Sequence, residues 1–315
     1  MQTAELRRQS ISSHPDFDEK DFTRVTDKAA EPLRPEQQSA WTIFLSILRK
    51  RKVTCFVIIL LLLLILACIF GPMLSPYDPN AIDATNRLQP PSAEHWFGTD
   101  DYGRDYFTRA LYGGRVSLLV GFATMLVTTL IGVTIGLISG YLGGWADTII
   151  MRCTDIFLAL PSLLLMIIIN TLFTPSLTTL IATLSLFSWA RVARITRAET
   201  MRMKRQDFVI ASRKLGASNL SLLFSHILPN IAGPIIVAAS LGVAGAILSE
   251  SSLSFLGLGV QIPNASWGSM LQNAQAQILD VPLLAVYPGL LILITVLGFN
   301  LMGDVLRAAI APKKN

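Results

Sequence analysis

The sequence has few charged residues for its length. Only 15% of its 315 residues are charged, whereas 52% are hydrophobic, and the mean hydropathy is +0.53. A soluble domain usually carries about 25% charged residues. This composition excludes an ordinary soluble globule, and we expect a membrane protein.

Cysteine is also scarce, and the three cysteines exclude a disulfide framework. Cys55 and Cys68 lie in one apolar run, too far apart along a helix to pair, and Cys153 lies much later in the chain. Leu66-Ala67-Cys68 faintly resembles a lipoprotein cleavage site, but the polar leader before it is far too long. The first apolar run is therefore predicted to be an uncleaved anchor.

Motifs for catalysis and nucleotide binding are missing. His14, His95 and His226 fall in three separate parts of the chain, so no catalytic base is paired with a nucleophile. The sequence has no Gly-x-x-x-x-Gly-Lys-Ser/Thr phosphate cradle. We expect no catalytic residue, no bound cofactor and no metal, and an energy source on a separate chain.

The interiors of the predicted spans also lack a convincing relay of buried Asp, Glu, Lys or Arg residues. Ion-coupled carriers usually need such groups, because a charge inside the membrane is costly and is kept for function. Asn170 and Glu250 come nearest, and both lie at predicted outer ends. An ion-coupled secondary carrier is the alternative from a different class.

Six apolar runs are present that approach the roughly 20 residues needed to cross a bilayer. They cover residues 53–74, 115–138, 156–173, 177–193, 228–249 and 284–303. The third and fourth are short, and residues 174–176 between them predict a tight hairpin. The predicted fold is an all-α, polytopic membrane protein with six transmembrane helices.

Small residues and prolines inside the runs predict how the helices pack. Gly132, Gly136 and Gly140 recur at every fourth position, which lets two helix backbones approach closely. Pro161 and Pro234 are predicted to kink their helices.

The distribution of basic residues predicts the topology. Residues 49–52 are all basic and abut the first run, which places the N-terminus in the cytoplasm. Six crossings then put the basic segment 194–226 and the C-terminus inside, and the segment 251–282, without lysine or arginine, outside. The outer loop 75–114 conflicts with this rule through Arg87, Arg104 and Arg109. The basic loops do not interleave aromatic residues, so no nucleic acid partner is expected.

The domain organisation follows from these runs. Residues 1–40 are polar and mixed in charge, which predicts a disordered cytoplasmic tail. A short helix is expected at the membrane surface over 41–48. The remaining parts are an anchor span with an outer loop (41–112), a transmembrane domain (113–304) that includes the docking loop 194–226, and a cytoplasmic tail (305–315).

The basic island at 205–230 is the most informative segment. Phe208, Ala211 and Leu215 recur at spacings of three and four and share one face of a helix. Gly216 lies where a left-handed C-cap is needed, and Ser218 can cap the next helix. The pattern predicts two short helices that present an apolar patch in a basic frame to a cytoplasmic partner.

This island resembles the loop by which importer permeases of the ATP-binding cassette (ABC) class engage their ATPases. The family motif reads Glu-Ala-Ala, three residues, Gly, nine residues and Ile-x-Leu-Pro. Ala211, Gly216, Leu228 and Pro229 match in register, and Ile210 replaces the Glu. The resemblance implies an ATPase-coupling loop of Asp207, Phe208, Ala211, Leu215, Gly216, Ala217, Ser218 and Pro229.

A second motif lies in the outer loop at residues 97–105. Thr99 is expected to cap a helix with Asp100 and Asp101 in its first turn, and Arg104, Asp105 and Arg109 to form exposed pairs at spacings of four. The segment lacks the alternating ligands and the terminal Glu of a calcium-binding loop. His95 beside the acidic residues suggests a transition metal site as an alternative.

The same stretch resembles Gly-Thr-Asp-x-x-Gly-Arg-Asp of the C-type subunit of dipeptide and oligopeptide permeases. Segments 251–271 and 303–307 resemble that subunit too. The implied outer-loop motif is Gly98, Thr99, Asp100, Gly103, Arg104 and Asp105.

The resemblance implies a type I ABC importer-like transmembrane domain in a bacterial plasma (inner) membrane, with both termini cytoplasmic. The chain would form half of the pore of a peptide importer, with nickel or metal chelates and opines as alternative cargo. The implied partners are the lipid bilayer, a second homologous permease, two cytoplasmic ATPase subunits that hold ATP and Mg, and an extracellular or periplasmic substrate-binding protein. Trp145, Asp147 and Arg152 are expected to form a secondary contact with the ATPase.

Overall fold

The computed structural model describes residues 40–310, in which all regular elements are helical. This confirms the all-α prediction. The elements are α2 (Ala40–Lys50), α3 (Lys52–Leu74), η2 (Ala84–Asn86), α4 (Tyr106–Leu142), α5 (Gly144–Ala159), α6 (Ser162–Leu172), α7 (Leu177–Lys204), α8 (Asp207–Lys214), α9 (Asn219–Ser221), η3 (Leu222–Ile227), α10 (Leu228–Phe255), α11 (Trp267–Ala274), η4 (Gln275–Gln277) and α12 (Leu283–Ile310).

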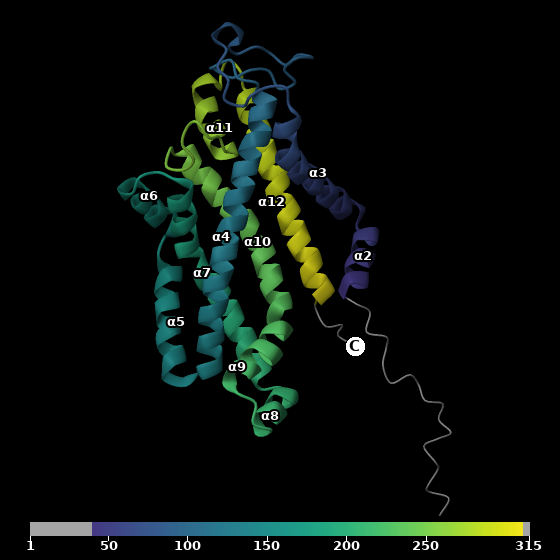
Figure 1. The fold of residues 1–315 in the computed structure, drawn as a ribbon, viewed down its shortest axis with the longest axis vertical. Helices are drawn as coiled ribbons and strands as arrows, with labels where there is room; N and C mark the ends of the chain where they lie inside the picture. The colour runs from purple at the N-terminus through teal and green to yellow at the C-terminus, as the bar shows by residue number, and fades with distance from the viewer. Residues whose placement is uncertain (1–39, 311–315) are drawn as a thin grey trace, which may run out of the picture. The chain divides into compact units, whose positions relative to one another are not determined.

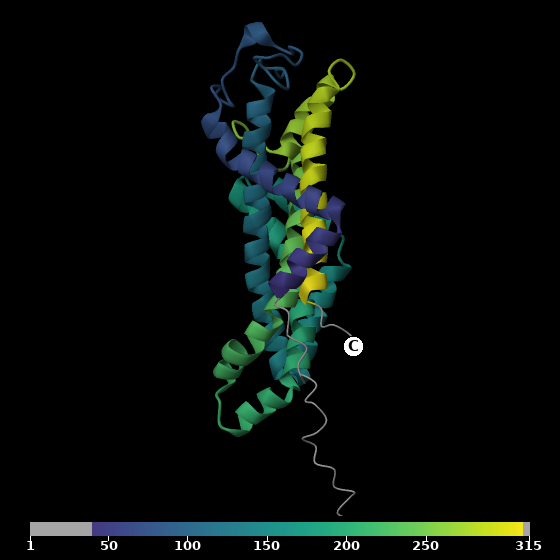
Figure 2. The ribbon, with the colours of Figure 1, turned by 90° about the vertical axis from the view of Figure 1, so that its right-hand side faces the viewer.

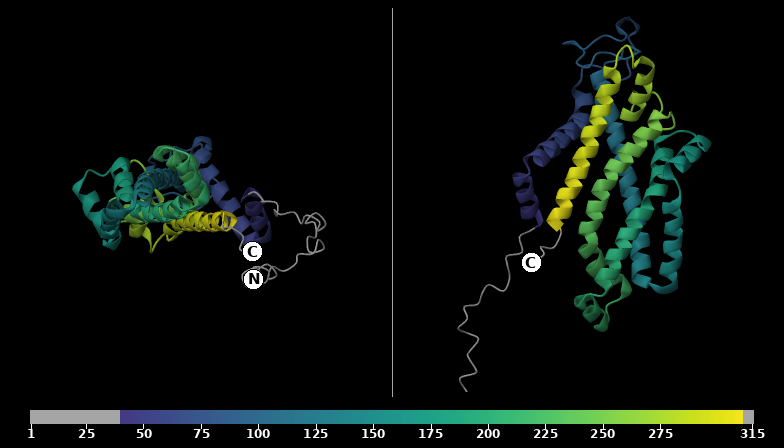
Figure 3. Two further views of the ribbon diagram at one scale, coloured as in Figure 1. Left: turned by 90° about the horizontal axis from the view of Figure 1, so that it is seen from below. Right: turned by 180° about the vertical axis from the view of Figure 1, so that it is seen from behind.

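The long helices lie side by side and separate two groups of connections (Figure 1). Residues 75–105 and α11 lie at one end, which we call the loop end, and α8 lies at the opposite end, which we call the α8 end. The view from behind shows the same arrangement, with α10 beside α12 (Figure 3). This alternation agrees with the order of inner and outer segments that the charges predict.

Four described helical stretches are long and apolar enough to cross a membrane: α3, α4, residues 219–255 and α12. A fifth is obtained if α5 and α6 form one span, although they are bent by 84° at the break between them. The predicted run 156–173 is therefore not one straight helix. Pro161 lacks the N–H that would continue the α5 hydrogen-bond ladder. The count of six crossings is compatible with this arrangement and stays a prediction.

Helix α7 continues well beyond the predicted end at residue 193. Its last eleven residues carry charges that would oppose burial in lipid, but two of them are paired with α5. Arg194 Nη2 lies 2.7 Å from Asp155 Oδ1, and Arg197 Nη2 lies 2.6 Å from Asp147 Oδ2. The segment 194–226 is therefore not a loop in its first third.

Helices α4 and α7 pack backbone to backbone along the predicted glycine stripe. A Cβ on Gly136 would lie 2.5 Å from the carbonyl oxygen of Ala193, and one on Gly132 would lie 2.6 Å from Val192 Cβ. This confirms the prediction of close approach. Helix α3 crosses α12 obliquely (Figure 2), where Gly298 gives room for Leu61.

The expected tail 1–40 lies outside the described residues except for Ala40, as do residues 311–315. Helix α2 confirms that residues 41–48 are helical. Helix α4 runs across the expected domain boundary at residue 113, and α12 runs across the expected start of the C-terminal tail at 305.

Candidate functional site

Helix α8 ends in the left-handed turn that the sequence predicts. Gly216 has a φ of +88°. Its N–H donates to the Arg213 carbonyl at 3.1 Å, and the N–H of Ala217 donates to the Ser212 carbonyl at 3.1 Å. These are the two hydrogen bonds of a Schellman motif. No atom would lie within 4 Å of a Cβ on Gly216, so the backbone conformation alone requires glycine.

The second helix of the segment begins at its predicted cap. The Ser218 hydroxyl accepts from the N–H of Ser221 at 3.2 Å. The chain then passes through the π-helix η3 into α10 without a break. Pro229, near the start of α10, therefore marks no change of direction, since it lies inside the continuous helix 219–255.

The predicted apolar patch of α8 is exposed. Leu215 is 89% exposed and Phe208 is 44% exposed, and Ala211 and Gly216 beside them are exposed too. We call these four residues the coupling patch. Of the remaining predicted coupling residues, Asp207, Ser218 and Pro229 are exposed and Ala217 is half-buried.

The anchor of α8 is Val209, which the sequence analysis did not single out. Its side chain is fully buried in a cluster with Leu137, Leu222 and Ile231. Val209 lies between Phe208 and the exposed Ile210 in sequence, so periodicity alone gives no reason to choose it. Burial of Val209 turns the coupling patch outward.

Tyr141, at the end of α4, fastens the α8 segment to the helix bundle. Its hydroxyl donates to Asn219 Oδ1 at 2.5 Å and accepts from Arg213 Nη2 at 3.3 Å. Its carbonyl accepts from Lys204 Nζ at 2.5 Å. One residue of α4 therefore contacts the end of α7, α8 and the start of α9.

Of the three residues of α5 expected to form a secondary contact, two are exposed and one is buried. Trp145 is 80% exposed at the α8 end, and Arg152 is exposed as well. Asp147 is instead buried, bonded to Arg197 and to the Ser139 hydroxyl. Asp147 therefore bonds within the bundle, and the expected contact of this segment with the ATPase stays a prediction.

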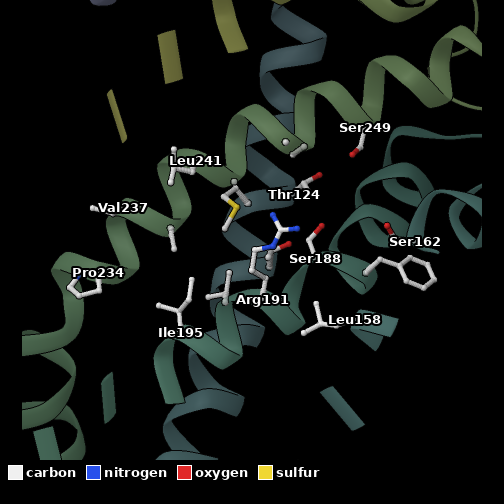
Figure 4. Close-up of a pocket in the computed structure, with 18 of the residues that line it drawn as sticks. Thr124, Leu158, Ser162, Ser188, Arg191, Ile195, Pro234, Val237, Leu241 and Ser249 are labelled. Carbon is white, nitrogen blue, oxygen red and sulfur yellow. The ribbon is translucent and has the colours of Figure 1, made fainter. Parts of the chain in front are cut away.

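A cavity of about 1140 Å³ lies among α4, α5, α6, α7, α10 and α12 (Figure 4). It follows α10 from Asn230 to Ser249, which at 1.5 Å per residue is about 28 Å. That length is close to the hydrocarbon thickness of a bilayer, about 30 Å. The helices that line a cavity of this length can form one wall of a passage across the membrane.

The outer motif is a folded turn and not the start of a helix, so the expected cap at Thr99 is wrong. Gly98 and Gly103 have φ values of +75° and +76°, and the chain doubles back between them. Helix α4 begins after Asp105, whose Oδ2 accepts from the N–H of Thr108 at 2.8 Å.

The charged residues of this motif form buried pairs, which corrects the expected exposed ones. Asp100 accepts from Arg104 Nε at 2.7 Å, and His95 Nδ1 lies 2.9 Å from Asp105 Oδ1. Arg109, 2% exposed, donates to the carbonyl oxygen of Pro79 at 2.9 Å. The Asp100–Arg104 pair has a spacing of four, whereas the His95–Asp105 and Arg109–Pro79 contacts join residues 10 and 30 positions apart, which spacing along one helix could not reveal.

These bonds reduce the conflict with the charge rule, since two of the three arginines are paired with Asp100 and only Arg87 is exposed. Arg104 and Arg109 are buried beside Asp100, and Arg87 Nε donates to the Asp101 carbonyl at 2.6 Å. Burial and the nearby Asp100 carboxylate raise the pKa of Asp101.

Within residues 40–310, no group of three His, Cys, Asp or Glu side chains is arranged to hold a metal ion.

The expected outer segment 251–282 is mostly packed against the bundle. Helix α10 continues to Phe255, and Trp267 is fully buried, its Nε1 donating to the Ala110 carbonyl at 2.9 Å. Ile262 and Leu279 stay 80% and 94% exposed. Exposed apolar side chains such as these, and not the buried motif residues, present a surface at the loop end.

Comparison with known families decides what this architecture is. Residues 132–315 match the profile of the binding-protein-dependent transport system inner membrane component. The chain belongs to this family. Residues 39–91 of the permease also match the N-terminal transmembrane domain of oligopeptide transport permease C.

Named relatives cover nearly the whole permease. It is 42% identical over 283 residues to the dipeptide transport system permease protein of Alkalihalophilus pseudofirmus, covering 89% of this chain and 93% of the relative. It is 42% identical over 284 residues to the oligopeptide transport system permease protein of Bacillus subtilis, covering 90% and 93%. It is 44% identical over 261 residues to the probable D,D-dipeptide transport system permease protein of Escherichia coli, covering 83% and 87%. The resemblance to C-type peptide permeases is confirmed.

Proposed function

We propose that this permease forms half of the translocation pore of an ATP-driven peptide importer and couples that pore to cytoplasmic ATPases. The named relatives support peptides as the cargo class. The observation that carries the coupling role is the coupling patch, since it is exposed and apolar while the helix beneath it is anchored by Val209 and Tyr141.

In this proposal the coupling patch lies in a groove of an ATPase subunit. Two such subunits hold ATP and Mg, and their closure displaces α8. Tyr141 and Val209 tie α8 to α4 and α10. The displacement of α8 therefore moves these long helices and converts the bundle from the inward-facing to the outward-facing state. A change between two states requires a difference in free energy, which nucleotide binding and hydrolysis supply.

The orientation follows from charge. The α8 end carries Lys204, Arg205, Arg213 and Lys214, whereas two of the three arginines in the 75–114 segment at the loop end are buried beside Asp100. We therefore place the α8 end in the cytoplasm. The loop end then faces a substrate-binding protein outside, in a bacterial inner membrane. A second homologous permease closes the cavity to complete the pore.

The test is uptake by the assembled complex. Proteoliposomes with the permease, its partner permease, the ATPases inside and the binding protein outside should accumulate a labelled peptide only when ATP is supplied. Nickel chelates and opines are offered to the same vesicles. Peptide uptake driven by an ion gradient without ATP, or uptake of the chelate or opine with none of the peptide, would overturn the proposal.

A further inference from the structure

Arg191, Arg194 and Arg197 lie at intervals of three residues on helix α7, but only two of them have an acidic partner. Arg194 is bonded to Asp155 at 2.7 Å, and Arg197 Nη2 to Asp147 Oδ2 at 2.6 Å. Both acids lie on α5. Arg191 forms no ion pair and no hydrogen bond with any residue of 40–310.

Arg191 is placed near the middle of α7 and lines the cavity. Figure 4 shows its guanidinium directed into the space between α7 and α10. Its side chain is exposed in the cavity, so the guanidinium is open to a solute that enters. A guanidinium without an internal counter-ion can bind an anion that the described chain does not supply.

The other ionisable groups around the cavity have partners. Arg202 Nη2 lies 2.8 Å from Glu199 Oε2, and Arg307 Nη1 lies 3.9 Å from Asp304 Oδ1. Among the cavity-lining charges of residues 40–310, Arg191 is thus the one without a counter-ion. An acidic group entering the cavity finds this guanidinium unoccupied.

We propose that Arg191 binds a carboxylate of the solute as it passes through the cavity. The inference rests on the proposed peptide cargo, and it names a recognition point for that cargo inside the pore. A guanidinium donates two parallel hydrogen bonds to a carboxylate, which gives orientation as well as attraction. A carboxylate of the partner permease or a lipid phosphate offers the same chemistry, and the experiment separates these sources.

The experiment compares Arg191→Gln, Arg191→Lys and wild type in the assembled, reconstituted complex. The matched control is Arg194→Gln, one turn away and outside the cavity lining. Two forms of one peptide are offered, with a free C-terminal carboxylate and with a C-terminal amide, chosen so that the binding protein retains both. The amount of assembled complex and its ATP hydrolysis are measured beside uptake.

Arg191→Gln should lower uptake of the carboxylate form at least tenfold and leave the amide form within twofold of wild type. Arg191→Lys should retain an intermediate rate, and Arg194→Gln should keep the preference of wild type for the carboxylate form. Unequal loss of the two forms is the signature, because a structural role would slow both alike.

Equal loss of both forms, with less partner permease co-purified, would assign Arg191 to a subunit contact and overturn the inference. A dependence on anionic lipid content in place of peptide form would assign it to a lipid phosphate, with the same consequence. Unchanged uptake of both forms would also overturn it. If wild type imports no peptide at all, the proposed function itself fails, and the inference with it.

Discussion

The hydroxyl of Ser117 donates to the carboxylate of Glu250 across 133 residues of sequence, with 3.0 Å between the two oxygens. The same hydroxyl accepts from the N–H of Trp267 at 3.2 Å. Ser254 donates to the other carboxylate oxygen at 2.7 Å and accepts from the N–H of Val260 at 3.1 Å. Glu250 thus joins α4, α10, α11 and the connection between the last two.

Replacing Glu250 tests this junction. Glu250 is fully buried, so Glu250→Ala leaves an empty volume and removes the acceptor of several hydroxyls. We expect a loss of about 2–4 kcal/mol of stability, measured as a lower thermal midpoint of the purified complex. Glu250→Gln keeps the volume and one acceptor and serves as control. Equal midpoints for Ala and wild type would show that the junction contributes little.

Replacing Leu215 tests the coupling patch. Because this side chain is 89% exposed, Leu215→Arg should leave folding and membrane insertion intact. Peptide uptake should fall at least tenfold, because a charge enters an apolar contact with the ATPase. Uptake and ATP hydrolysis are measured in proteoliposomes, with Leu215→Met as the conservative control. Normal uptake by Leu215→Arg would remove the assigned role of the patch.

Removing the hydroxyl of Tyr141 tests how α8 is tied to the bundle. Tyr141→Phe keeps the ring and loses the hydrogen bonds to Asn219 and Arg213, each worth about 1 kcal/mol. We expect uptake per ATP hydrolysed to fall several-fold while the complex still assembles. Tyr141→Ala should lower it further. An unchanged ratio in Tyr141→Phe would place the mechanical link elsewhere, for instance at Val209 alone.

Two glycines with similar positive φ values test the outer turn. Gly103 has φ +76°, and a Cβ there would collide with the backbone of Asp83. Gly143 has φ +70°, but nothing lies within 4 Å of its Cβ position. Gly103→Ala should expose segment 75–105 to proteolysis, whereas Gly143→Ala should show only the backbone strain of about 1–3 kcal/mol. Equal protease sensitivity would show that the collision is relieved by local movement.

The parts of this permease that the sequence predicts well depend on local patterns. Gly216 and Ser218 act within three residues of themselves, so their caps are readable without tertiary information. The glycine stripe of α4 can likewise be recognised from the sequence of one helix, although the identity of the helix that packs against it cannot.

The parts that escape prediction depend on contacts between distant segments. The extension of α7 requires the acids of α5, 39 residues away in the case of Arg194 and Asp155. Asp105 pairs with His95 and Arg109 donates to the carbonyl of Pro79, 10 and 30 residues away in sequence, so spacing along one helix suggests the wrong partners for these two residues. Val209 is buried because of how α8 lies on α4 and α10, and its neighbours in sequence do not distinguish it.

Site-directed crosslinking tests the central claim most directly. Leu215→Cys is introduced with Cys55, Cys68 and Cys153 replaced by serine or alanine, and the assembled complex is exposed to a short thiol crosslinker with and without ATP. The account predicts a covalent product between the permease and an ATPase subunit, with a yield that changes on ATP binding. Labelling of this cysteine by an impermeant reagent added outside intact cells, with no ATPase product, would contradict it.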